Sequence, residues 1–406
     1  MAAPYIIIGN GVAGVNAAET IRARDPRAQV IVITDQECEF YSRPALYYYL
    51  LGRIEFADTV GRPRGFYRRN RFDLQCATTV SSLDPEARTI TLADGAELSY
   101  RRILLATGTR GRMLPWVREG VKGLIGLNTL RDVVEITHAM QDAEAAVVVG
   151  GGLTSIEIVE SLAHHGIKTT FIMRDDRFLA KQMTSEEAEV VHDALRRMGV
   201  DVRTGEEVTE MSVADGRVTG VTTKSGDHIP CQIISLAVGI APNRELAEAA
   251  GAEVAAGIVV DDSMRTSLPD VFAAGDCAQV RQADGSAAPA EMLWYVAAHM
   301  GRVAGANMKG GAERYEAAPF LNVSELAGVD FCGVGSIVPD QDGVETLWAP
   351  YTPHGTARVV LRDGYIVGGC FVGDIRVGDL TRALIAHRAR WEELPKDHPL
   401  RARFHC

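Results

Sequence analysis

Two stretches of this chain combine a short apolar strand, a glycine-rich turn and a helix-compatible segment. In the first, residues 5–8 are apolar, the turn reads GNGVAG from Gly9 to Gly14, and residues 13–24 suit a helix that ends before Pro26. Residues 29–34 (QVIVIT) supply a second apolar strand. This order predicts a βαβ unit with a parallel sheet covered by helices.

The same pattern returns near the middle of the chain. Residues 145–149 (AAVVV) predict a strand, GGGLTS (150–155) a turn followed by a helix to about Gly166, and residues 169–173 the next strand. Apolar residues at helical spacing then predict an amphipathic helix over 184–198. A supersecondary unit that occurs twice predicts two related domains, in keeping with 406 residues, which exceed a single core.

The first glycine turn has the spacing of a dinucleotide-binding loop. Gly9 would make the tight turn, Gly11 would let the backbone approach a pyrophosphate, and Gly14 would let the helix pack closely on the strand. The helix N-terminus offers free N–H groups to the phosphates. Asp35, at the end of the second strand, is positioned to bond a ribose hydroxyl.

The second turn keeps Gly150 and Gly152 and has the small Ser155 at the third position. The acid expected after its second strand is absent: Met173 stands there and Arg174 follows. An arginine in this place can pair with a 2′-phosphate, so the residues favour NADPH over NADH. The alternative is that Arg174 is a solvated strand end.

Composition excludes several classes of protein. A net charge of −11 argues against nucleic acid and anionic membranes as partners, and no apolar run is long enough to span a bilayer. We see no secretory signal and expect a cytoplasmic protein. Dispersed cysteines without a CxxC pair argue against a disulfide framework or a metal site. They are Cys38, Cys76, Cys231, Cys277, Cys332, Cys370 and Cys406.

The tail from about residue 320 differs in kind from the two βαβ units. Residues 357–373 predict a hairpin with Asp363-Gly364 at its turn, and residues 378–392 an amphipathic helix. These signals favour a separate α+β domain.

Several further motifs, in order, resemble the pyridine nucleotide-disulfide oxidoreductases, which are flavoproteins with two dinucleotide-binding domains. They are LLATGT (104–109), GVKGLIGLNTLRDV (120–133), AVGIAPNRELAEAAG (237–251), VFAAGDC (271–277) and LWYVAAHMGRVAGANM (293–308). The resemblance covers residue 5 to about residue 310.

The resemblance implies an α/β fold with two Rossmann-like domains, for FAD and NAD(P), and a small C-terminal α+β domain. The FAD domain would comprise residues 1–118 and 243–318, the NAD(P) domain 119–242, and the C-terminal domain 319–406. By similarity, Asp276 would contact the flavin's ribitol, Trp294 would lie near its ring, and Glu157 near the nicotinamide. The matching motifs add Thr107, Gly108, Gly239 and Gly275 to the cofactor-binding residues. Alternatives from the residues alone are a turn residue at Asp276, a core Trp294 and an exposed Glu157.

The segment FYSRPALYYYLL (40–51) resembles the ferredoxin, rubredoxin and nitrite reductase-type members, in which the arginine, here Arg43, lies beside the flavin. Disulfide-reducing relatives carry cysteines in this region, whereas this chain has Ser42, Arg43, Pro44 and Ala45. Without a thiolate there, a dithiol relay cannot be built. Tyr48 replaces a lysine common in ferredoxin reductases; the tyrosine run also suits an amphipathic helix.

The resemblance therefore implies an enzyme that passes electrons from NAD(P)H through FAD to an iron–sulfur carrier of ferredoxin or rubredoxin type. Five arginines in RPRGFYRRNR (62–71) could form a docking patch, or only a solvated face. Two other readings stay open. One is an NAD(P)H oxidase or a quinone or small-molecule reductase; the other is a non-catalytic flavoprotein subunit or redox sensor. A homodimer or a larger complex is compatible with each.

Overall fold

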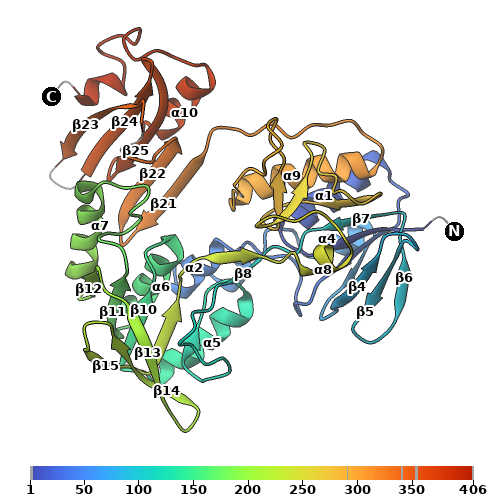
Figure 1. Ribbon diagram of the computed structural model, residues 1–406, viewed down its shortest axis with the longest axis horizontal. Helices are drawn as coiled ribbons and strands as arrows, with labels where there is room; N and C mark the ends of the chain where they lie inside the picture. Colours follow the sequence, from blue (N-terminus) through green and yellow to red (C-terminus); the bar gives the residue numbers. More distant parts are fainter. Residues whose placement is uncertain (1–2, 290, 340–341, 353–354, 405–406) are drawn as a thin grey trace. The chain divides into compact units, whose positions relative to one another are not determined.

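The computed structural model describes residues 3–289, 291–339, 342–352 and 355–404 (Figure 1). The chain divides into two compact units. Unit 1 comprises Met1–Arg110 and Ile240–Ala317, and unit 2 comprises Gly111–Gly239 and Ala318–Cys406. Unit 2 thus combines two segments that the sequence analysis assigned to separate domains. The described helices include none that is both long and apolar enough to cross a membrane.

Unit 1 is built on a parallel sheet with the strand order β19-β7-β1-β2-β3. The strands are β1 (Tyr5–Ile8), β2 (Val30–Ile33), β3 (Phe72–Gln75), β7 (Arg102–Leu105) and β19 (Val271–Ala273). Strand β1 is the central strand. Strands β2 and β3 lie on one side of it, and β7 and β19 lie on the other. In sheets of this kind, ligands bind at the carboxyl ends of the strands where the order reverses.

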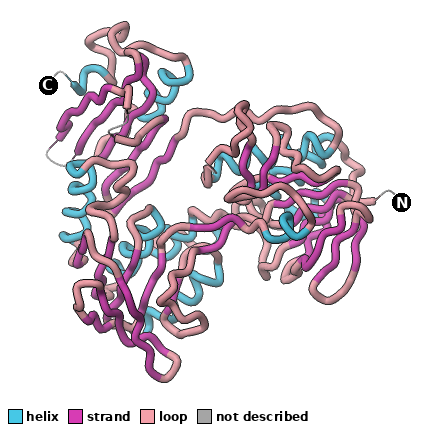
Figure 2. The backbone as a smooth tube through the Cα atoms, viewed as in Figure 1, coloured by secondary structure: helices cyan, strands magenta, loops and turns pink. Residues whose placement is uncertain are grey.

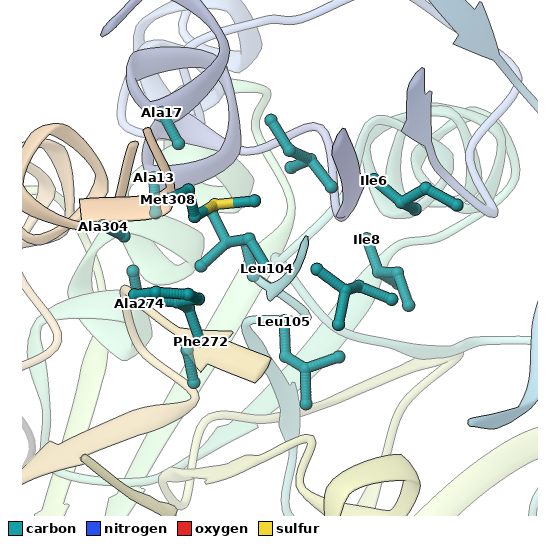
Figure 3. Close-up of a cluster of buried hydrophobic side chains, with 14 of the residues drawn as sticks. Ile6, Ile8, Ala13, Ala17, Leu104, Leu105, Phe272, Ala274, Ala304 and Met308 are labelled. Atoms are coloured by element: carbon teal, nitrogen blue, oxygen red, sulfur yellow. The ribbon is translucent and has the colours of Figure 1, made fainter. Parts of the chain in front are cut away.

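Two helices of unit 1, α1 (Val12–Arg24) and α9 (Trp294–Met308), pack directly on each other. A Cβ added to Gly301 would lie 2.2 Å from the Ala13 oxygen, and one added to Gly305 would lie 2.5 Å from the Ala17 oxygen. The two glycines therefore set how closely the helices approach. Figure 3 shows the apolar side chains between the helices and the sheet, among them Ala13, Ala17, Leu104, Phe272 and Met308.

Smaller elements complete unit 1. An antiparallel sheet contains β4 (Val80–Asp84), β5 (Thr89–Leu92) and β6 (Glu97–Ser99), and β18 (Ile258–Val260) pairs with β20 (Ala278–Val280). Strand β8 (Thr109–Gly111) pairs with β17 (Ile240–Pro242). The short helices are α2 (Ala45–Leu50), α3 (Phe56–Thr59), α4 (Phe66–Asn70) and α8 (Glu245–Ala249).

Unit 2 repeats the parallel arrangement with the strand order β12-β11-β10-β16-β9. Its strands are β9 (Leu124–Ile125), β10 (Ala145–Val149), β11 (Lys168–Met173), β12 (Asp201–Thr204) and β16 (Ile233–Leu236). The helices are α5 (Leu130–Gln141), α6 (Leu153–His164) and α7 (Ser185–Arg197). Strands β13 (Val208–Ala214), β14 (Arg217–Thr223) and β15 (His228–Pro230) form an antiparallel sheet. The α/β fold with two Rossmann-like domains is confirmed.

The C-terminal part of unit 2 is an antiparallel sheet with the order β21-β22-β25-β24-β23. Figure 2 shows the strands near the C-terminus in magenta. The strands are β21 (Leu321–Leu326), β22 (Val329–Gly335), β23 (Glu345–Thr352), β24 (Gly355–Arg362) and β25 (Tyr365–Val372). Helix α10 (Gly378–Ala386) packs against β22 and β25, and a 3₁₀ turn covers Arg401–Phe404. The predicted hairpin is confirmed: β24 and β25 meet at Asp363 and Gly364, which have φ angles of 51° and 77°.

The helix predicted over 378–392 ends early, at Ala386. Arg388 has a φ of 52°, which a continuing right-handed helix does not allow. The next residues instead bond to the hairpin: Ile366 N–H donates to Ala389 O, and Trp391 N–H donates to Gly364 O. These tertiary hydrogen bonds override the helical periodicity of the sequence.

Candidate functional site

The glycines of the first loop have different surroundings. An added Cβ would lie 2.0 Å from the Ala106 oxygen at Gly9 and 2.0 Å from the Gly9 oxygen at Gly14. At Gly11, no described heavy atom lies within 4 Å of an added Cβ. Gly9 and Gly14 therefore allow close packing, whereas Gly11 borders open space of the kind that a pyrophosphate needs.

Helix α1 begins directly after Gly11, and its first turn contains no acidic residue. Helix α6 in unit 2 begins in the same way after Gly152, again without an acid in the first turn. Both N-termini therefore keep their partial positive charge available for an anionic group.

A small cavity, open to solvent, adjoins the first loop. It is lined by Asn10, Gly11, Thr34, Gln36, Cys38, Glu39, Tyr41 and Arg43. Asp35 is exposed and does not belong to this lining. Gln36 and Glu39, which the sequence analysis did not select, supply polar groups there. The binding role predicted for Asp35 stays a prediction.

Tyr67 does not line the cavity but hydrogen-bonds to a residue that does. Its hydroxyl donates to Asn10 Oδ1 at 2.6 Å and accepts from Phe40 N–H at 3.2 Å. Burial raises the pKa of Tyr67 to about 12, so the hydroxyl keeps its proton. Tyr41 donates to Gln36 Oε1 at 2.6 Å. These bonds fix the polar edge of the cavity.

Arg43, Gly108 and Asp276 come from distant parts of the sequence and meet in unit 1. Arg43 Nη1 lies 3.7 Å from the position of an added Gly108 Cβ, and Gly108 has a φ of 66°. Burial raises the pKa of Asp276, and the charge of Arg43 opposes that rise. Because Arg43 also lines the cavity, the structure brings these three predicted residues to one place.

Two other predicted residues of unit 1, Thr107 and Gly275, shape the backbone near Gly108 and Asp276. Thr107 Oγ1 donates to Asn243 O at 2.6 Å, and Asn243 Nδ2 donates to Thr107 O at 2.9 Å. Gly275 has a φ of 81°, and an added Cβ would lie 2.9 Å from Ala13 Cβ. Gly275 thus lets the segment with Asp276 approach helix α1.

Trp294 is the first residue of α9, and 45% of its surface is exposed. This exposure argues against the alternative that Trp294 is a core residue. The tyrosine run, by contrast, forms helix α2, in which Tyr47 is buried. The rings of Tyr47 and Tyr48 are in contact, with centroids 5.0 Å apart and planes tilted by 54°.

In unit 2, the second glycine loop has the same local design as the first. Gly150 has a φ of 141°, and an added Cβ would lie 2.2 Å from the Ala237 oxygen. Gly152 has no described atom within 4 Å of an added Cβ. Ser155 is fully buried, and its hydroxyl donates to Gly152 O. The serine therefore preserves close packing at the third position of the loop.

Glu157 lies in the second turn of α6 and is partly buried. Burial, and after it the nearby Glu160, raises the pKa of Glu157 to about 7. An exposed helix carboxyl would not show this shift, so the structure argues against that alternative. Near neutral pH this carboxyl can hold a proton.

Two other predicted residues of unit 2 lie at chain turns. The Arg174 side chain is 73% exposed after β11, and its Nε lies 3.5 Å from Asp175 Oδ1. Gly239 has a φ of 104°, and its oxygen accepts from Arg112 N–H at 3.0 Å. Their binding roles stay predictions.

The described cysteines are all free thiols. Cys38 lies on the cavity wall, and Cys76, which is distant in sequence, points its Sγ towards Cys38 O at 3.6 Å. Burial raises the pKa of both thiols, and Cys76 and Glu37 add to the shift at Cys38. Cys277 is fully buried behind Asp276, and burial raises its pKa too. A raised pKa disfavours the thiolate that a relay needs.

The arginines of residues 62–71 do not form one uniform patch. Arg62 pairs with Glu19 at 2.7 Å and covers the rings of Phe40 and Phe66. Arg71 donates to Pro26 O, and Arg69 to the oxygens of Arg64 and Pro63. Arg64, Arg68, Arg69 and Arg71 are all exposed, so their charge is accessible to a partner.

Two parallel sheets, each with a glycine loop at a helix N-terminus, define a protein that binds two dinucleotides. The family model "Pyridine nucleotide-disulphide oxidoreductase" matches residues 3–301. The chain belongs to this family. It is an oxidoreductase whose cofactors are FAD and NAD(P)H, and the open Gly11 and Gly152 positions fit such dinucleotides.

Curated relatives include rhodocoxin reductase of Rhodococcus erythropolis, 32% identical over 67% of this chain and 64% of the relative. Rubredoxin-NAD(+) reductase of Ectopseudomonas oleovorans is 29% identical over 68% of this chain and 72% of the relative. The matched region thus spans about two thirds of these relatives. Among solved structures, the ferredoxin reductase for the CYP199A2 system of Rhodopseudomonas palustris has a TM-score of 0.86 and 26% identity, covering 95% of both chains.

Proposed function

We propose that this chain transfers electrons from NAD(P)H, through FAD, to an iron–sulfur electron carrier of ferredoxin or rubredoxin type, without a cysteine relay. The observation that supports this most is the place of Arg43. It lies beside Asp276 and Gly108 in the segment where thiol-using members of the family carry cysteine. The relatives include a rubredoxin reductase and a ferredoxin reductase, and these names point to the same class of acceptor.

When bound, FAD would supply hydride acceptance from the nicotinamide and release of electrons one at a time, which suits an iron–sulfur acceptor. The residues of the chain bind and orient the cofactors. The N-termini of α1 and α6 would hold the phosphates, Asp276 would hold the ribitol hydroxyls, and Arg43 would keep a positive charge at this end of the site. Glu157 supplies a carboxyl that is partly protonated near pH 7.

An acidic carrier would dock through exposed positive charge. Arg64 and Arg68 belong to the same unit as the first glycine loop and provide such charge despite the acidic character of the whole chain. Charge complementarity of this kind mainly raises the association rate and makes it sensitive to salt. We propose the cytoplasm as the location, where an electron carrier of this type and free thiols are both stable.

The experiment that tests the proposal is anaerobic stopped-flow mixing of the FAD-loaded protein with NADPH or NADH, followed by a panel of acceptors. We expect bleaching of the flavin's visible absorbance within one turnover time, then rapid reoxidation by a ferredoxin or rubredoxin and slow reoxidation by air. Rapid recovery in air alone would favour an oxidase. Failure of both nucleotides to bleach the flavin would favour a non-catalytic role.

A further inference from the structure

The C-terminal sheet is joined to the nucleotide-binding part of unit 2 by a buried ion pair. Arg358 lies on β24 and Glu187 on α7, and both side chains are 0% exposed. The distances are 2.8 Å from Arg358 Nε to Glu187 Oε1 and 3.1 Å from Nη2 to Oε2. In Figure 1, α7 lies beside this sheet.

Arg358 also holds two backbone oxygens. Its Nη2 lies 2.7 Å from Gln182 O and 2.9 Å from Ile337 O, and the two hydrogens of Nη2 are shared among these oxygens and Glu187 Oε2. Gln182 belongs to the segment from residue 174 to residue 183, which joins β11 to α7 and is called here the 174–183 segment. Glu187 Oε2 in turn accepts from Thr184 N–H at 2.8 Å, so the partner of Arg358 caps the helix that this segment enters.

The 174–183 segment contacts the second glycine loop directly. Leu179 N–H donates to Gly151 O at 2.9 Å. Phe178 N–H donates to Nε2 of the buried His192 at 3.2 Å, and Arg177 Nε donates to Met183 O at 2.9 Å. Leu179 itself has a φ of 45°, so its conformation depends on these bonds.

The position of this segment matters for a dinucleotide. In a Rossmann-type domain, the residues after the second strand meet the adenosine ribose or its 2′-phosphate. Here those residues are Arg174 and Asp175, at the beginning of the segment. Any shift of the segment would move both charges relative to the glycine loop.

A buried ion pair is a costly way to hold two elements together, because apolar residues of similar volume often stabilise as well or better. The planar guanidinium, however, can bond a carboxylate and two carbonyl oxygens in fixed directions, which apolar packing cannot do. The contacts of Arg358 therefore indicate a need for a fixed position rather than for stability alone.

We propose that Arg358 is a positioning residue for NAD(P)H: from the C-terminal domain, it holds the 174–183 segment against the second glycine loop and so sets the adenosine end of the nucleotide site. The inference rests on the proposed function, because it assumes that the second loop takes the nicotinamide dinucleotide. It also gives the C-terminal domain a role in nucleotide affinity.

The test compares Arg358→Met with the matched control Arg403→Met. Arg403 is also buried in the C-terminal domain, but its guanidinium pairs with Asp374 of the same domain at 2.9 Å. In Arg358→Met we expect faster hydrogen exchange at the amides of Phe178, Leu179 and Met183, and a rise of at least about tenfold in the Kd and KM for NADPH. The FAD content, and kcat at saturating NADPH, should stay unchanged. Arg403→Met should leave the exchange and the Kd within about twofold of wild type.

Arg358→Lys is the second variant, in case methionine opposite the buried Glu187 prevents folding. Lysine keeps the charge but not the fork of donors, so we expect a smaller rise in Kd and faster exchange at the same amides. The proposal is overturned if a folded Arg358 variant keeps wild-type exchange and NADPH affinity. It is also overturned if Arg403→Met weakens NADPH equally, since general loosening would then explain the effect. If wild-type protein binds neither nucleotide, the proposed function fails and the positioning role fails with it. If wild-type protein binds NADPH and the folded Arg358 variants bind it equally well, only the positioning role fails.

Discussion

Gly11 and Gly14 lie three residues apart, yet a side chain would have different consequences at each. At Gly14 it would meet the Gly9 oxygen, whereas at Gly11 it would enter open space. We therefore expect Gly11→Val to fold and to lose most of its FAD, and Gly14→Val to lose stability. Flavin absorbance per protein and thermal unfolding separate the two effects. A fully yellow Gly11→Val protein would mean that the first loop is misassigned.

Glu157 makes the stability of the protein depend on pH. Because its pKa rises from 4.5 to about 7 on folding, the folded state holds the proton more tightly, and stability falls as pH rises from 4.5 to 7. At about 1.4 kcal/mol per pH unit, the shift corresponds to about 3 kcal/mol. Glu157→Gln should remove this cost, so its stability gain should be larger at pH 8 than at pH 5. Urea unfolding at both pH values measures the difference; an equal effect at both would place Glu157 in a more solvated site.

Arg174 is the residue on which the predicted preference for NADPH depends. Its exposed guanidinium is free to turn towards a 2′-phosphate, although Asp175 competes for it at 3.5 Å. We expect Arg174→Glu to raise the Kd for NADPH by about tenfold or more and to change that for NADH little. Binding titrations with both nucleotides check this. An unchanged preference would remove Arg174 from the site.

At the scale of elements, the local sequence predicts the parallel sheets well and the contacts between distant segments poorly. Strands β1 and β10 have the predicted bounds, because a fully buried strand before a glycine turn leaves little freedom in register. Helix α10 is shorter than predicted, since the hairpin competes for the backbone of its last residues. The residues around Arg43 were predicted through family motifs, but the closeness of Cys38 and Cys76 has no local signal.

Helices α1 and α9 offer the clearest prediction at this scale. A side chain at Gly301 would lie 2.2 Å from the Ala13 oxygen, so the helices must separate to admit it. We expect Gly301→Val to cost about 3 kcal/mol or more and to release FAD, because α1 carries the first loop. Gly126→Val is the control, since no described atom lies within 4 Å of its added Cβ. Chemical denaturation and flavin content measure both; equal stabilities would show that the helix contact is not tight.

At the scale of the whole molecule, the proposed function requires a flavin that works alone, without a thiol partner. Cys38 is the cysteine to examine, because it lies on the wall of the cavity beside the first loop. Burial raises the pKa of the Cys38 thiol, which disfavours the thiolate at neutral pH. The absence of cysteine from residues 42–45 argues against a thiol relay there. No local signal in the sequence indicates that Cys38 borders the cavity.

An anaerobic titration of the FAD-loaded protein with NADPH tests this claim most directly. A flavin alone stores two electrons, whereas a flavin with a reducible disulfide stores four. We predict complete bleaching at about one equivalent of NADPH per FAD, and the same endpoint for Cys38→Ser. An endpoint near two equivalents that falls to one in Cys38→Ser would contradict the account.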